Sequence, residues 1–148
     1  MKRTFKTIAI SLAVFVHCVA AQADESTGQL IRREAPKGIT AAFFACIDKA
    51  SSDRIAIAAC HSDEQAKQDA RLNKTYKALL ARLGAREKES LVGAQRAWLE
   101  LQTRSSVFEE ALYADEPIAG MQVKLNGIFR LCERANVLEK YLSIAKDQ

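Results

Sequence analysis

The chain has 148 residues, of which 49% are hydrophobic and 7% aromatic, and its 22 basic and 18 acidic side chains leave a net charge of +4. This length and apolar content suit one domain with its own core, and the composition excludes collagen-like, low-complexity and polytopic membrane proteins. Two features suggest a function, the four cysteines and the small excess of positive charge, and the N-terminus contributes to both.

The first 23 residues have the pattern of a secretory signal peptide. Three basic residues precede an apolar run from Ile8 to Val16, and Ala21-Gln22-Ala23 supplies the small side chains of a cleavage site. The run is shorter than the roughly 20 residues that a membrane span needs. No lipobox is present, so we expect cleavage after Ala23 and a periplasmic or secreted protein.

Cleavage changes the charge and the cysteine count. It removes three of the 22 basic residues and none of the 18 acidic ones, so the net charge falls from +4 to +1. Cys46, Cys60 and Cys132 remain, together with a single histidine, His61. A near-neutral domain lacks the concentrated basic surface that nucleic-acid binding requires. We therefore expect no nucleic-acid partner and no membrane insertion after cleavage.

The remaining chain divides into an arm and a helical domain. Residues 24–39 are polar and contain one proline and two glycines, which predicts a flexible N-terminal arm. The domain, residues 40–148, begins with two short helices, residues 41–50 after Thr40 and residues 54–60 after Asp53, both good N-cap residues. These form a short N-terminal helical pair.

Three longer helices follow. Ser62 and Gln65 form a capping box that opens a helix ending before Gly84, a residue typical of a helix C-terminus. The next helix, residues 86–113, carries residues of one predicted buried stripe at three-four spacing: Leu91, Ala94, Trp98, Leu101, Ser105, Phe108 and Leu112. The last runs from Met121 to Ala145. We predict an all-α fold, an antiparallel bundle of three main helices plus the short pair.

The short linker Gly84-Ala85 forces the two helices around it into an antiparallel hairpin. Residues at equal distances from the linker should then lie side by side, which places Asn73 level with Gln95 and Arg96. We expect a polar cluster of Asp69, Asn73, Gln95 and Arg96 across the hairpin. The alternative is that these side chains are ordinary solvated surface.

The same residues carry a resemblance to a known family. Asp69, Leu72, Asn73 and Tyr76 form an Asp-x-x-Leu-Asn-x-x-Tyr motif, and Gln95, Arg96 and Trp98 follow Ala94 in an Ala-Gln-Arg-x-Trp motif. With Cys46, Cys60 and Cys132, these resemble the LprI-like lysozyme-inhibitor family over roughly residues 43–142. The resemblance implies a small exported helical protein in which the motif residues have structural roles. The family's Arg-Asp and third cysteine are replaced here by Gln102, Thr103 and Ser106.

Disulfides are expected in an exported domain, because its compartment is oxidising. A bond between Cys46 and Cys60 would staple the short helical pair and stabilise it by about 3 kcal/mol through loop closure. Because the family's third cysteine is Ser106 here, the resemblance implies that Cys132 is a free, buried thiol. The competing pairing is Cys60–Cys132.

No set of residues predicts catalysis, a metal site or a cofactor. A Cys132 nucleophile would need His61 as its base, but the apolar neighbours of Cys132 favour an inert thiol. One histidine and three scattered cysteines lack the paired spacing of a zinc site. Trp98 lies on the apolar stripe and is expected in the core.

The remaining hypothesis is a binding protein of the cell envelope, not an enzyme. Following the resemblance, the first reading is an inhibitor of lysozyme or a related peptidoglycan hydrolase, whose cleft holds carboxylates. Candidate contacts are Arg54 in the turn pinned by the disulfide, and Arg86 and Lys88 beside the hairpin linker. The alternative for these three is solvated surface. The second reading is a non-inhibitory adaptor, stress or immunity protein that binds another secreted protein.

Overall fold

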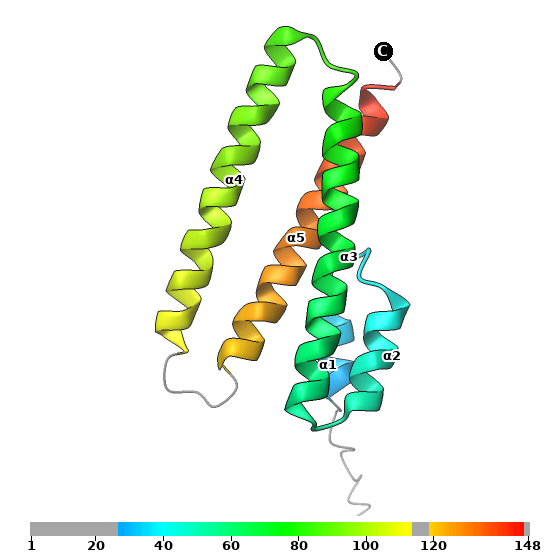
Figure 1. Cartoon of the computed structure of the whole chain (residues 1–148), viewed down its shortest axis with the longest axis vertical. Coiled ribbons are helices and arrows are strands. Elements are labelled where there is room, and N and C mark those ends of the chain that lie inside the picture. Colours follow the sequence, from blue (N-terminus) through cyan, green and yellow to red (C-terminus); the bar gives the residue numbers. More distant parts are fainter. Residues whose placement is uncertain (1–26, 114–118, 147–148) are drawn as a thin grey trace, which may run out of the picture.

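The computed structural model describes residues 27–113 and 119–146, and these form α-helices with no β-strand. Two short helices, α1 (Thr27–Glu34) and α2 (Ala41–Ala50), precede three long ones, α3 (Arg54–Leu80), α4 (Ala85–Leu112) and α5 (Ala119–Ile144) (Figure 1). The all-α prediction with three main helices is confirmed. The predicted signal peptide lies outside the described residues.

α3 is one continuous helix of 27 residues, where the sequence predicts a break at Ser62. Asp53 caps it, and its carboxylate accepts hydrogen bonds from the backbone amides of Ile55 and Ala56 at 2.9 and 3.2 Å. Ser62 lies inside the helix, where its hydroxyl donates to the carbonyl oxygen of Ala58. Neither glycine nor proline interrupts this stretch, so a single cap is enough.

The connection between α3 and α4 also differs from the prediction. α3 ends at Leu80, and Gly84 is the N-cap of α4 with a φ of −70°. Gly84 therefore does not end α3 in a left-handed conformation. A turn of four residues, 81–84, separates the two helices.

Residues 27–39, predicted to belong to a flexible arm, are folded instead. They hold α1, which packs on α2 and places Arg32 in an ion pair with Asp48 and over the ring of Phe44 at 4.6 Å. Ile39 is buried after it. An eight-residue helix makes only about two turns, which is too short for a periodic pattern in the sequence.

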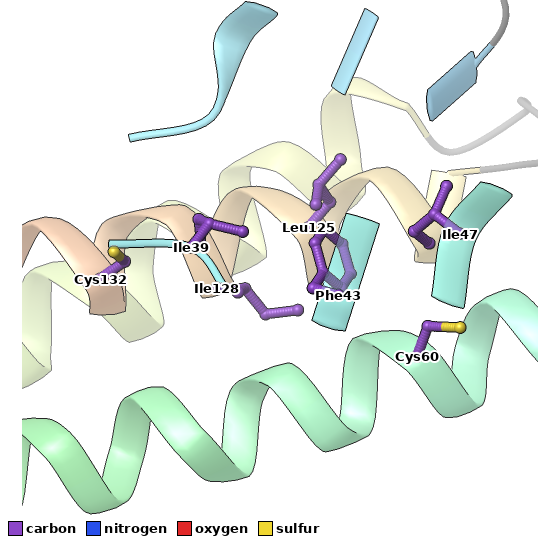
Figure 2. Packing of buried hydrophobic residues seen from close by; sticks show 7 residues of the cluster. All are labelled: Ile39, Phe43, Ile47, Cys60, Leu125, Ile128 and Cys132. Carbon is purple, nitrogen blue, oxygen red and sulfur yellow. The ribbon is translucent and has the colours of Figure 1, made fainter. Parts of the chain in front are cut away.

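The core consists of two clusters that share α5. The first joins α2 and the N-terminal half of α3 to α5, and it contains Ile39, Phe43, Ile47, Cys60, Leu125, Ile128 and Cys132 (Figure 2). The second joins α3 and the first turns of α4 to α5, and it contains Leu72, Leu79, Leu91, Leu131, Ala135 and Leu138. α5 is therefore the central helix of the bundle.

The cysteines follow the prediction. Cys46 of α2 and Cys60 of α3 form the disulfide. The bond therefore links α2 to the long α3, where the sequence predicted a bond between two short helices. Cys132 is a free thiol with no exposed surface. Ser106, which stands where the family has its third cysteine, is not next to Cys132. It contacts Arg130, which lies about 200° around α5 from Cys132.

A polar network holds the segment between α1 and α2 against the bundle. The amide of Gln68 donates to the carbonyl oxygen of Gly38 at 2.9 Å, and the amide of Asn136 donates to that of Lys37 at 2.7 Å. Gly38 has a φ of +111°, which side chains with a Cβ rarely adopt. Two carbonyl oxygens of this turn thus accept hydrogen bonds from side chains of α3 and α5.

α4 diverges from α3 beyond their connection, and α5 packs against both (Figure 1). α3 and α4 make almost no contact with each other. The side of α3 that faces α4 is polar along much of its length, with Gln65, Asp69 and Asn73. The apolar side chains that α3 offers there, Leu72 and Tyr76, pack in the second core cluster, so little apolar surface is available to draw the two helices together.

We expect Gly38→Ala to lower the free energy of unfolding by about 1–3 kcal/mol, the cost of a strained backbone conformation. A Cβ at this position would also lie 2.6 Å from a guanidinium nitrogen of Arg71 and 3.1 Å from the Cys132 sulfur. Urea denaturation measures the loss. Gly93→Ala is the control, because a Cβ there meets nothing within 4 Å and alanine favours a helix. Equal stability of Gly38→Ala and wild type would contradict this account.

Candidate functional site

An open groove of about 920 Å³ lies between α3 and α4, with α5 as its floor. It exists because the two helices diverge. The α3 wall includes Asp69, Asn73 and Tyr76, and the α4 wall includes Arg96 and Leu99. Seven residues of the two sequence motifs, all except Ala94, line it: Asp69, Leu72, Asn73, Tyr76, Gln95, Arg96 and Trp98. This groove is the candidate functional site.

The predicted polar cluster across the hairpin does not form. The side chains of Asp69, Asn73 and Arg96 make no hydrogen bond or ion pair within the described part of the chain. Gln95 turns to α5 instead, where its side-chain oxygen accepts a hydrogen bond from Arg134 at 3.0 Å. α3 and α4 make almost no contact with each other, so these side chains do not meet.

Four motif residues hold the fold. Leu72 is buried in the second core cluster, and Tyr76 and Trp98 pack against it, half-buried. Gln95 is buried, and the guanidinium of Arg134 that it binds lies 5.9 Å from the centre of the Trp98 ring. Arg134 thus joins Gln95 and Trp98 of the α4 motif to α5.

The other three motif residues that line the groove have no such role. Asn73 and Arg96 are exposed, Asp69 is half-exposed, and all three face the groove. They stand beside apolar surface, including Leu99, which is 53% exposed. The groove therefore combines unused hydrogen-bonding groups and a cation with aromatic and aliphatic side chains. This composition is typical of surfaces that bind other proteins.

The prediction that one stripe of α4 is buried is wrong for most of the residues in that stripe. Leu91 is buried, but Leu101, Phe108 and Leu112 are 60%, 64% and 63% exposed. The side of α4 that contacts α5 lies roughly 100° around the helix axis from this stripe. The C-terminal half of that contacting side is polar. There Arg130 of α5 donates to Gln102 at 2.6 Å and to Ser106 at 3.3 Å, and it pairs with Glu109.

The sequence interpretation missed both arginines of α5 and the buried polar residues of α3. The latter carry a signal that could have been found. The buried positions of α3 keep a three-four spacing throughout, and two of them, Glu64 and Gln68, lie between Cys60 and Leu72. A polar residue in register with an apolar stripe marks a buried polar group. Arg130 and Arg134 have no comparable signal, because their partners are set by packing between α4 and α5.

The three predicted partner-binding residues lie apart from one another. Arg54 is exposed at the start of α3, and Arg86 and Lys88 are exposed in the first turn of α4. The length of α3, about 40 Å, separates them. No single partner cleft can therefore be filled by all three, and none of them lines the groove.

A comparison with known protein families shows which family this chain belongs to. A family model described as "Lysozyme inhibitor LprI" matches residues 46–139, which include both motifs and Cys46, Cys60 and Cys132. The chain belongs to the LprI lysozyme inhibitor family. No curated protein and no solved structure matches it. Its membership places the chain in a family named for inhibition, an activity exerted by binding a protein.

In the described part of this LprI family member, Cys132 and His61 do not form a nucleophile–base pair. Burial raises the pKa of the Cys132 thiol, and the nearby Arg71 guanidinium offsets this only in part. Neither ring nitrogen of His61 has a hydrogen-bond partner, so no Cys–His pair exists among the described residues. Within residues 27–113 and 119–146, no group of three or more potential ligands is placed to hold a metal ion. No helix in these ranges is long and apolar enough to cross a membrane.

His61 makes the stability of the domain depend on pH. Its side chain is buried beside Phe43, and this burial lowers its pKa, with a smaller contribution from the Lys124 ammonium. In the unfolded chain the imidazole titrates near its ordinary pKa of about 6.5. Between that value and the lowered one, the unfolded state binds the proton and the folded state does not. Stability therefore falls as the pH drops through this window.

We expect the free energy of unfolding to decrease from pH 7.5 to pH 5, and His61→Phe to remove part of this decrease. Urea denaturation of both proteins at several pH values measures the two slopes. Phenylalanine keeps an aromatic ring against Phe43 but cannot be protonated. The same slope in both proteins would show that His61 does not titrate in this way.

Proposed function

We propose that this protein is exported to the periplasm or the medium and inhibits lysozyme or a related peptidoglycan hydrolase by binding it. Three considerations support this: the membership of the LprI family, the signal-peptide pattern of residues 1–23, and the groove. We further propose that the groove is the surface that binds the enzyme.

One observation carries the assignment of the groove. Asp69, Asn73 and Arg96 are motif residues, yet their side chains make no polar contact within the described part of the chain. The stability of the fold therefore does not explain why these three positions carry Asp, Asn and Arg. A binding partner does, because exposed polar groups around an apolar surface give an interface its specificity.

The chemistry of the groove fits the edge of a hydrolase cleft. Glycoside hydrolases place two carboxylates in a cleft that must admit a polymer. If one lip of that cleft sits in the groove, the α4 wall occupies the path of the polymer. Arg96 then supplies a cation toward the acidic cleft, and Asn73 and Asp69 bind polar groups of the lip. Tyr76 and Trp98 supply the apolar contact, as aromatic residues commonly do at the centres of interfaces.

The direct test is inhibition of lysozyme by the purified mature chain, residues 24–148. We expect the protein to slow the hydrolysis of a peptidoglycan suspension and to bind the enzyme in a titration. We expect Arg96→Glu to weaken inhibition about tenfold or more, since central interface residues contribute more than 1 kcal/mol. No inhibition and no binding at micromolar concentrations would leave the second reading, a non-inhibitory envelope protein.

Arg86→Glu and Arg54→Glu are the matched controls for the groove. Each makes the same charge change at an exposed arginine outside the groove, so each is expected to leave inhibition unchanged. Loss of inhibition in either control, together with full inhibition by Arg96→Glu, would transfer the binding surface to an end of α3. Far-UV circular dichroism of all three variants checks that they are folded.

A further inference from the structure

The outer side of α4, away from the groove, is an apolar face that nothing in the described chain covers. Leu101, Phe108 and Leu112 follow one another at spacings of seven and four residues and therefore share one side of the helix. They are 60%, 64% and 63% exposed. Their spacing is that of a buried stripe, but their own chain leaves them open. Large apolar side chains gathered in this way mark an interaction surface.

The first half of the same face has small residues. Gly93, Ala94 and Ala97 are all exposed, and a Cβ added at Gly93 would have no atom within 4 Å. α4 is 28 residues long, and Leu101 lies close to its middle. The outer face is therefore small and flat before Leu101 and large and apolar after it.

We propose that a second copy of this chain covers this face, with the two α4 helices antiparallel and the two-fold axis near Leu101. In this arrangement Phe108 of each copy lies level with Ala94 of the other, since both are seven residues from the axis. The large half of each helix then packs onto the small half of the other. Such self-complementarity is what a two-fold interface requires. A parallel pair would instead place Phe108 against Phe108 and leave the small halves facing each other.

The charges beside the face support the same arrangement. Glu100 and Arg104 flank Leu101, and they pair with each other at 2.6 Å within the helix. Around an axis near Leu101, Glu100 of one copy comes within a turn of Arg104 of the other. The antiparallel pair thus brings opposite charges together, whereas a parallel pair would bring like charges level.

The proposed dimer does not depend on the proposed inhibition. Arg96 and Leu99 of the groove lie roughly 140–160° around α4 from Leu101, so dimerisation leaves both grooves open. A contact between two single helices is small for a stable interface. We therefore expect a reversible dimer that dissociates at micromolar concentrations.

Sedimentation velocity of the mature chain over a range of concentrations tests the association. We expect Phe108→Glu to raise the dissociation constant roughly 30-fold or more, because it removes an apolar anchor. Val107→Glu is the matched control, since Val107 is the neighbouring residue and is 61% exposed but lies on the groove side. A monomer at all concentrations, or equal effects of the two variants, would overturn the proposal.

Cross-linking tests the register. A single cysteine at the axis, Leu101→Cys, is expected to join two copies through a short bismaleimide, whereas Phe108→Cys is not, because the two residues 108 are far apart in the antiparallel pair. Efficient cross-linking of Phe108→Cys would overturn the antiparallel arrangement. A different outcome would overturn both proposals: the wild-type protein is a monomer, Phe108→Glu abolishes lysozyme inhibition, and Arg96→Glu does not. The outer face of α4 would then be the surface that binds the enzyme.

Discussion

The carboxylate of Glu64 is fully buried, and three donors surround it. The backbone amide and the hydroxyl of Thr40 donate to it at 3.0 and 2.6 Å, and the amide of Gln68 donates at 2.8 Å. A buried carboxylate is tolerated only when its hydrogen bonds are satisfied. These bonds therefore fix the start of α2 on α3. The disulfide fixes the end of α2 on the same helix.

The rest of the N-terminal half depends on this attachment. Once Thr40 is held, the turn before it runs across α3 and α5, where Gln68 and Asn136 bind the carbonyl oxygens of Gly38 and Lys37. Arg71 completes the network through bonds to Gln68 and Asn136 at 3.2 and 2.6 Å. The result is a rigid joint between α3 and α5, and it covers Cys132 completely. An inert thiol follows from that cover.

Among the described helices, α4 packs mainly on α5. α5 holds α4 through Arg130 and Arg134, which bind Gln102 and Gln95 respectively. Long guanidinium side chains keep the two helices in a defined position by directional bonds. α4 makes almost no contact with α3, so the groove between them stays open. The outer face of α4 lies roughly 100° around the helix from the side that contacts α5, so this face is exposed as well.

Much of the architecture is local and was readable from the residues. Helix starts depend on caps such as Thr40 and Asp53, and both act as predicted. The Cys46–Cys60 bond was readable because the two cysteines are close in sequence and the family pattern leaves Cys132 without a partner. The motif residues lie together around one groove. Their division into residues that hold the fold and residues that face the groove was not readable, because it depends on whether Gln95 turns to α3 or to α5.

The sequence therefore determined the helical class, the disulfide and the family, since these follow from spacing along one chain segment. Only the tertiary structure decided which faces are covered. Phe108 and Leu101 have the spacing of core residues and are exposed, whereas Glu64 and Gln68 are polar and buried. The physical reason is that burial depends on what stands opposite a helix. That is set by the orientation of α4 and α5 through contacts between residues distant in sequence, and no periodicity within one helix contains this information.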